Sequence, residues 1–330
     1  MPQFGLKYTA LIMYRKGYPL YKPTPSGIST VYRKHGVRVG DVGAITEEGA
    51  FDFMFNACQG HDQPDAAVNP AKLPDRFELL SLESGIQVEQ MFGPETLLPG
   101  NHVSEIRRRD LGCIDRLLPK SWRSRHLRCH ATEGAALALP KGATLYEAVN
   151  KLHFRKHAAR HAIDWYKYML DEGRDISNGS LYFVTKCVKS VNWGTAVFFA
   201  RPIAGDYLRL VFSHDSCQWH YCGKVDPREG PNIIPSDNEP NQCVFLSAYK
   251  VMLRQDIWNK LLKNAIAVDP PQYGEYPSPP STRTSDHSPN PSVSGSQTED
   301  GRSARDTSRG KQYASQTIHR YAWNRIGQPR

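Results

Sequence analysis

The sequence lacks any long uninterrupted hydrophobic run. Its longest apolar stretches, around Ala10–Tyr14 and Val197–Ala200, cover only a few residues, whereas a membrane-spanning helix needs about 20 mainly apolar residues. The first residues also lack a positively charged stretch followed by an apolar one, so we expect no secretory signal peptide. These absences favour a soluble protein that is not secreted.

Cysteine is sparse and odd in number. Seven cysteines are scattered through 330 residues, whereas small secreted scaffolds carry dense, evenly paired cysteines. We therefore expect reduced thiols and a cytoplasmic or nuclear location.

The familiar motifs of catalysis are also missing. The sequence contains no GxSxG elbow, P-loop, Rossmann glycine fingerprint or HExxH motif. An enzyme of unidentifiable class remains an alternative, and it requires a pocket in which separate segments meet. The residues that would have to converge in it are Cys58, His61, Asp41, His126 and His130.

The composition changes abruptly after Asp269. From there to Gly310 the only large apolar residues are Tyr273, Tyr276 and Val293, which is too few to offset the entropy cost of ordering the chain. We predict one folded domain over residues 1–268, with 1–140 and 141–268 as alternative sub-lobes. Residues 269–330 are predicted to be a disordered Pro/Ser-rich tail.

The clearest helical pattern runs from about residue 144 to residue 170. Thr144 and Glu147 have the spacing of a capping box at its start. Apolar residues recur at helical spacing on one face, and Phe154, Ala158, Ala162 and Trp165 widen this stripe. The residues of the stripe are Leu145, Val149, Leu152, Ala159, Ile163, Tyr166 and Leu170.

Several short segments rich in β-branched and aromatic residues predict strands. Residues 37–45 and 51–55 flank an acidic glycine turn and indicate a hairpin. Residues 77–91 are a candidate strand pair. Four later runs joined by short links favour an antiparallel meander, and they are Leu181–Val188, Trp193–Ala200, Tyr207–Phe212 and Cys217–Cys222. The predicted fold class is α+β, with antiparallel sheets packed on the one long amphipathic helix.

Three histidines on the predicted helix, His153, His157 and His161, are spaced by four residues. This spacing brings imidazoles to one face, as in zinc-binding helices. However, no glutamate follows the first histidine, and Lys156 and Arg160 would repel a cation. The pattern therefore favours a solvated basic face over a metal site.

A second group of metal-ligating residue types lies in a stretch with no clear secondary structure. Cys113, His126, Cys129 and His130 could together close a structural zinc site. The spacing is not that of a CxxC knuckle, and several arginines crowd the segment.

The same stretch is strongly basic, in a chain whose formal net charge is +9. With Trp122 among them, its cations could follow a phosphate backbone while the indole stacks on a base. The candidate nucleic-acid contacts are Arg107, Arg108, Arg109, Arg123, Arg125 and Arg128. An anionic membrane surface is the other acidic partner that this charge allows.

Three segments resemble a known family. They begin at Gly17 (GYPLYKPTP), at Gly36 (GVRVGDVG, followed by GAFDFMFNA) and at Asn178 (NGSLYFVTKC). Their order and spacing are similar to a lineage-specific family of uncharacterised proteins from mushroom-forming (basidiomycete) fungi. The resemblance spans roughly residues 10–255 and excludes the tail. It implies one module of constant length and no particular activity, ligand or catalytic residue.

The absence of catalytic motifs makes a non-catalytic intracellular interaction or sensing module the preferred interpretation. Its folded domain would bind a protein partner, and its tail would act as a tether. A basic nucleic-acid-associated protein and an enzyme remain as alternatives. No cofactor is predicted apart from zinc at the Cys/His group.

Overall fold

Strands dominate the fold. The computed structural model describes residues 8–9, 12, 17–25, 29–60, 68–82, 85–106, 123–201, 203, 206–212, 216–231, 239–266 and 319–320. The strands there are β1 (Tyr18–Pro19), β2 (Asp41–Ile45), β3 (Phe51–Asn56), β4 (Ile86–Phe92), β5 (Thr96–Pro99), β6 (Val103–Ile106), β7 (Arg123–Cys129), β8 (Gly134–Leu139), β9 (Ala143–Ala148), β10 (Leu181–Ser190), β11 (Trp193–Phe198), β12 (Tyr207–Phe212), β13 (Cys217–Cys222), β14 (Val225–Gly230), β15 (Gln242–Val251) and β16 (His319–Arg320). The labelled helices are α2 (Thr30–His35), α4 (Lys151–Asp171) and α5 (Gln255–Ile266).

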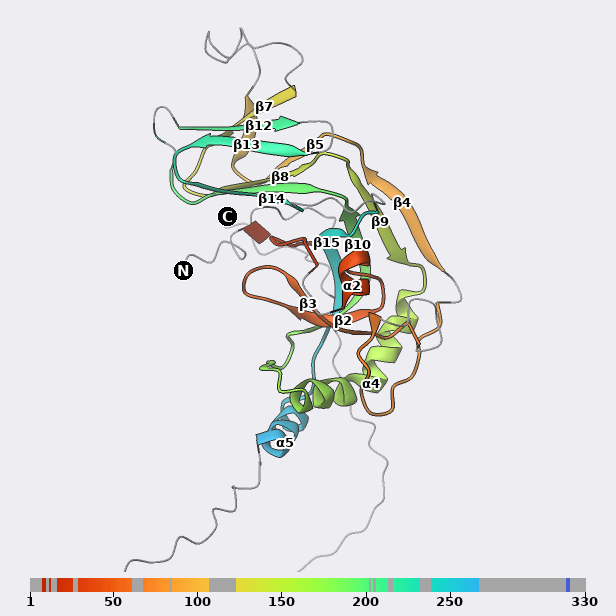
Figure 1. The fold of residues 1–330 in the computed structure, drawn as a ribbon. Coiled ribbons are helices and arrows are strands. Elements are labelled where there is room, and N and C mark those ends of the chain that lie inside the picture. The colour runs from red at the N-terminus through yellow and green to blue at the C-terminus, as the bar shows by residue number, and fades with distance from the viewer. Residues whose placement is uncertain are drawn as a thin grey trace, which may run out of the picture.

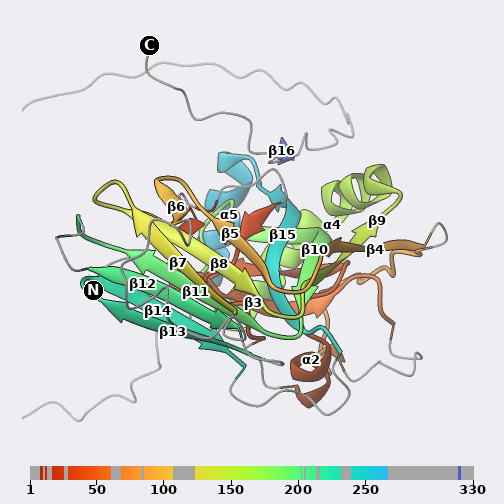
Figure 2. The ribbon, with the colours of Figure 1, turned by 90° about the horizontal axis from the view of Figure 1, so that it is seen from above.

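In the described part of the chain the strands form three antiparallel sheets. The largest has eight strands in the order β1-β15-β10-β2-β3, with β9 and then β4 continuing from β10, and with β16 on β15. The two four-stranded sheets have the orders β14-β11-β8-β5 and β13-β12-β7-β6. These two lie stacked at one end of the molecule, and α4 and α5 lie at the other (Figure 1). Seen from above, β4 and β9 lie on the same side of the molecule as α4 (Figure 2).

The sheet that contains β8 and β11 lies between the other two, because its two faces belong to different hydrophobic clusters. Ala136 and Ala138 on β8 pack with the β12–β13 hairpin, whereas Leu137 and Leu139 pack with residues of β10 and β15. All six residues of β8 and all six of β11 are buried. A strand buried on both faces shows no alternation of polar and apolar residues, which explains the run GAALAL.

The predicted first hairpin is confirmed, since β2 and β3 pair antiparallel across the acidic turn. The four predicted later strands also exist as β10, β11, β12 and β13. The prediction of one meander is wrong, however, because only β12 and β13 pair with each other. Val191 and Asn192 carry the chain from β10 in the eight-stranded sheet to β11 in the middle sheet. Of the predicted 77–91 strand pair, the structure shows β4, and its described residues 77–82 form no strand.

The predicted helix start is wrong. Thr144 and Glu147 belong to β9, which pairs with β10 on one side and β4 on the other. Helix α4 begins at Lys151, after an Asn150 N-cap whose side chain makes no capping hydrogen bond. Backbone pairing with β10 and β4 on both sides holds these residues in a strand, although their spacing is that of a capping box.

The prediction that the sheets pack on the one long helix, α4, is also wrong. Helix α4 packs against β10 and β15 at one end of the eight-stranded sheet, and the indole of Trp258 in α5 lies edge-on to Tyr166 of α4 at 5.3 Å between ring centroids. The antiparallel α+β character is therefore confirmed, and the arrangement of sheets on one helix is corrected.

The division into domains stays a prediction. Strands from both sides of residue 140 share the eight-stranded sheet, because β2 pairs with β10 and β4 pairs with β9. The predicted tail lies outside the described residues except for β16, whose two residues pair with Tyr249 and Lys250 of β15.

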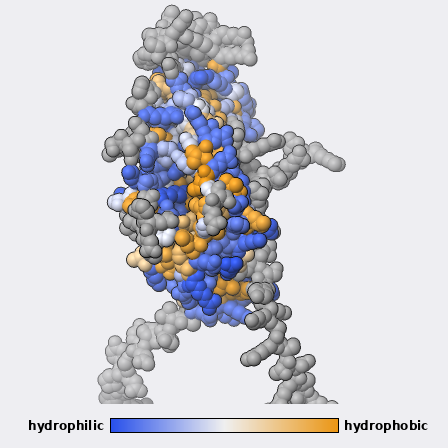
Figure 3. Space-filling view, turned by 90° about the vertical axis from the view of Figure 1, so that its right-hand side faces the viewer, coloured by the Kyte–Doolittle hydropathy of each residue, from blue (hydrophilic) through white to orange (hydrophobic). Residues whose placement is uncertain are grey.

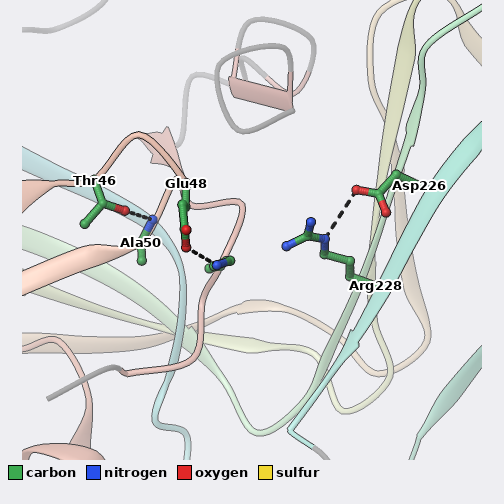
Figure 4. Close-up of polar contacts among 6 residues, drawn as sticks. Thr46, Glu48, Ala50, Asp226 and Arg228 are labelled. Carbon is green, nitrogen blue, oxygen red and sulfur yellow. Dashed lines mark hydrogen bonds and ion pairs between the residues drawn. The ribbon is translucent and has the colours of Figure 1, made fainter. Parts of the chain in front are cut away.

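Polar contacts among Tyr21, Lys22, Glu48, Asp226 and Arg228, which we call the clasp, join the middle sheet to the β2–β3 hairpin. The buried Tyr21 hydroxyl donates a hydrogen bond to Asp226 on β14, and the Arg228 guanidinium lies over the Tyr21 ring, 4.6 Å from its centroid. Arg228 also pairs with Asp226 at 3.3 Å (Figure 4). Glu48, at the hairpin turn, pairs with Lys22. Burial and the bond to Asp226 raise the pKa of Tyr21, so its hydroxyl remains a donor.

We expect Asp226→Ala to lower the free energy of unfolding by about 1–3 kcal/mol, because it leaves the buried Tyr21 hydroxyl without its acceptor. Urea unfolding measures the change. Glu48→Gln is the control, since it alters an exposed ion pair of the same clasp and should change stability by less than about 0.5 kcal/mol. Equal effects of the two substitutions would contradict the role given to Tyr21.

Candidate metal centre

Residues 68–82, which we call the strap, run along α4 in the opposite direction. Three ion pairs fix its register, and they are Lys72–Glu172 at 3.0 Å, Asp75–Lys167 at 2.6 Å and Glu78–Arg160 at 3.0 Å. Each exposed pair contributes at most about 1 kcal/mol. Together they nevertheless place Glu78 beside the first half of the helix.

Hydrogen bonds hold the strap from its inner side as well. The Tyr168 hydroxyl of α4 donates to the Lys72 carbonyl at 3.1 Å, and the Leu80 amide donates to the Ala57 carbonyl at 2.8 Å. The Asn69 side-chain amide donates to the Asn56 carbonyl at 3.0 Å. The strap is thus anchored both to α4 and to the chain just after β3.

His157 and His161 occupy the buried face of α4, and the predicted solvated position of these two histidines is wrong. Each is only 6% exposed. Their rings lie 4.5 Å apart, and the His161 ring stacks on Trp165 at 6.5 Å with an interplanar angle of 19°. Four-residue spacing brings two imidazoles to one helix face, and the strap covers the arc that the sequence pattern assigned to solvent. Of the three predicted histidines, only His153 is exposed.

Glu78 completes a group of three ligands. One of its carboxylate oxygens, Oε2, lies 3.1 Å from Nε2 of His161, and all three ligand atoms of Glu78, His157 and His161 lie within 4.8 Å of one another. Two ligand atoms that each lie about 2 Å from one tetrahedral ion are about 3.3 Å apart. A small closure of the side chains would therefore suffice to bind an ion.

The protonation states of the site suit a metal. Burial, and secondarily the neighbouring His161, lower the pKa of His157 to about 4, so its imidazole is neutral at physiological pH. The hydrogen bond from Arg160 lowers the pKa of Glu78, whose carboxylate is therefore ionised. A metal binds the neutral imidazole and the ionised carboxylate, so His157 and Glu78 need lose no proton on binding.

The donor set narrows the class of ion. Two imidazoles and one carboxylate suit zinc and other first-row transition metals, Fe(II) among them, whereas calcium and magnesium prefer oxygen ligands alone. Three protein ligands also leave at least one coordination position open.

A cavity of about 320 Å³ lies beside the three ligands, between the strap and the first half of α4. Glu78 and His157 line it directly, so an open coordination position would face into it. The other lining residues are Leu79, Leu80, Ser81, Leu82, Gly85, Ala148, Asn150, His153, Phe154, Lys156 and Arg160.

The structure does not gather the predicted zinc quartet within the part of the chain that it describes. His126 and Cys129 are buried on β7, while the exposed His130 shares a hydrogen bond of 2.6 Å with the Ser104 hydroxyl. Cys113 lies outside the described residues, so the quartet stays a prediction.

The predicted nucleic-acid contacts are only partly described. Arg107, Arg108 and Arg109 lie outside the described residues, as does the side chain of Arg123. Arg128 is exposed on β7, and Arg125 pairs with Glu105 at 2.8 Å.

Of the described candidates for catalysis, Asp41, Cys58 and His126 are buried, and His130 is exposed. Burial raises the pKa of the Cys58 thiol, which disfavours a nucleophilic thiolate. Asp41 is fully buried and accepts a hydrogen bond from Asn56. His61 lies outside the described residues.

The sequence pattern of His157 and His161 was assigned to a solvated face, and Glu78 was not considered as a ligand at all. The His157–His161 spacing was visible, yet Glu78 lies in a segment with no regular structure of its own. Only the ion-pair register of the strap places it beside the histidines.

No family model matches this chain, and no curated protein matches it either. Among the described helices, none has the length and apolar character needed to cross a membrane.

Proposed function

We propose that the chain is a non-catalytic sensing module that binds one zinc-class divalent ion through Glu78, His157 and His161. The observation that carries the proposal is the convergence of these three ligand atoms within 4.8 Å, two of them on buried histidines. Bound metal would hold the strap against α4. Metal occupancy would therefore control the surface that these two segments form, and through it the predicted protein partner.

The lining of the cavity favours binding over hydrolysis. A zinc hydrolase of the helical type places a general-base glutamate directly after its first histidine, and Ala158 stands at that position here. Glu78 is the only carboxylate among the described lining residues, and it would be occupied as a ligand.

Titration of the metal-free full chain with Zn²⁺ in a calorimeter at pH 7.5 tests the proposal. We expect one ion per chain, and about 100-fold weaker binding for His157→Ala, which removes one of three ligands. Glu78→Gln serves as a second variant, because residue 78 is exposed and the substitution preserves the size of the side chain. Circular dichroism confirms that each variant is folded.

His130→Ala is the matched control, since it removes an exposed histidine from the predicted zinc quartet instead. Its affinity for Zn²⁺ should equal that of the wild type. Loss of binding in His130→Ala together with normal binding in His157→Ala would overturn the proposal in favour of the quartet.

A further inference from the structure

The cavity beside the candidate ion has the size and lining of a small-molecule site. Its volume of about 320 Å³ lies at the lower end of the range for ligand pockets, roughly 300–1,000 Å³. The apolar part of its lining includes Leu79, Leu80, Leu82 and Phe154, and the cationic part consists of Lys156 and Arg160. A ligand that fits both parts has an apolar body and a negative charge.

The charge balance of the site calls for an anion. A divalent ion would add two positive charges next to those of Arg160 and Lys156, while Glu78 supplies a single negative charge among the described lining residues. The side chains of Arg160 and Lys156 are exposed, so solvent screens part of their repulsion with a bound ion, and an anion in the cavity would reduce it further. Arg160 and Lys156 therefore disfavour a metal ion bound alone and favour a metal ion bound together with an anionic co-ligand.

The coordination of the ion leaves room for such a co-ligand. Three protein ligands leave a position that water or a ligand oxygen fills, and carboxylate oxygen is a common zinc ligand. Because His157 and Glu78 line the cavity, a carboxylate entering it reaches the ion directly.

The apolar surface continues outside the cavity mouth. Five of the large hydrophobic side chains that are exposed in the described residues belong to the strap, to β4, to the link before α4 and to the first turn of α4. They are Leu79 (46% exposed), Ile86 (38%), Val88 (59%), Val149 (56%) and Leu152 (58%). Figure 3 shows apolar residues gathered on this side of the molecule. Exposed apolar clusters next to a groove are typical of ligand sites.

We propose that the cavity binds a small amphipathic carboxylate, whose carboxylate group coordinates the ion and whose apolar body packs on the strap leucines and Phe154. This inference rests on the proposed metal function. The ion and the carboxylate then bind cooperatively, since each neutralises part of the repulsion that the other meets. Linkage requires the coupling to be reciprocal.

Calorimetry on the full chain with octanoate as the probe tests the inference. We expect octanoate to bind the zinc-loaded protein about tenfold more tightly than the metal-free protein, and octanoate to tighten zinc binding by the same factor. Octanol and octylamine, which share the apolar body but lack the carboxylate, should not bind. Octanol binding as tight as that of octanoate would overturn the inference.

Two variants of α4 separate the ligand from the metal. Lys156→Glu reverses an exposed charge in the cavity lining and should weaken octanoate binding about tenfold, with one zinc ion still bound. Arg155→Glu makes the same change at an exposed position outside the lining and should leave both affinities unchanged.

The remaining outcomes distinguish the two proposals. Zinc binding without any effect on octanoate would overturn the carboxylate site and leave the metal site intact. Absence of zinc binding would overturn both. Zinc-independent binding to phosphatidylserine vesicles that octanoate cannot compete with would assign the apolar surface to a membrane and overturn the inference.

Discussion

Asp41→Asn is expected to gain stability relative to the wild type as the pH rises, and His157→Gln is expected to gain stability as the pH falls. Asp41 accepts hydrogen bonds from the Arg38 amide and from the Asn56 side chain, both at 2.7 Å. Burial nevertheless raises its pKa to about 7, against those two hydrogen bonds, which lower it. The folded state therefore holds a proton that the unfolded state releases near pH 4.

The direction in which the Asp41 contribution to stability changes with pH follows from this difference in bound protons. Between about pH 4 and pH 7 the folded wild type binds more protons than the unfolded chain, so the contribution of Asp41 to stability falls as the pH rises. A shift of about three pKa units corresponds to about 4 kcal/mol. Asp41→Asn removes this loss, so the difference in unfolding free energy between variant and wild type should rise by up to that amount from pH 4 to pH 8.

The contribution of His157 to stability changes with pH in the opposite direction. The His157 folded-state pKa of about 4 lies below the unfolded value near 6.5, so the unfolded chain binds the extra proton. The contribution of the neutral His157 side chain to stability is fully present above about pH 6.5 and is lost as the pH falls towards 4. His157→Gln should therefore gain up to about 3 kcal/mol relative to the wild type over that range.

Urea unfolding from pH 4 to pH 8, with a chelator present, gives both difference curves. Groups common to the variant and the wild type cancel in each curve. The double variant should show both slopes, because the effects of independent sites add. A flat curve for Asp41→Asn would mean that the buried carboxyl is ionised in the folded protein.

The parts of the fold that were predictable from the sequence are local. Residues 41–45 and 51–55 pair across their own turn, and the alternation of residues in β12 is visible without knowing its partners. Sheet membership was not predictable in this way, since β10 and β11 follow each other directly in the chain yet belong to different sheets. Such choices depend on pairings between distant segments.

The start of α4 shows how such pairing overrides a local signal. Residues 144–147 satisfy the capping-box pattern, but β10 and β4 flank them and form a sheet instead. As a result Val149 and Leu152, assigned to the buried stripe, are exposed. The candidate site has the same origin, since Glu78 meets the histidines only because the strap runs along α4 in the opposite direction.

Trp165→Ala is expected to have the largest effect on stability. Its indole is buried at the centre of the core that α4 forms with the eight-stranded sheet, edge-on to Phe55 at 5.6 Å and to Phe183 at 5.1 Å. It also lies against both histidines, at 5.8 Å from His157 and 6.5 Å from His161. Removing a buried tryptophan costs about 3–5 kcal/mol, in lost burial and in the cavity left behind.

The same substitution should weaken zinc binding about tenfold, because the indole holds both imidazoles in place. Trp258→Ala is the matched control, since Trp258 is also buried but packs on Tyr166 from α5. It should lower the urea midpoint by a comparable amount and leave zinc affinity unchanged. Equal zinc affinities in the two variants would show that Trp165 supports the fold without positioning the histidines. Weaker zinc binding in Trp165→Ala alone would show that the core and the metal site share this side chain.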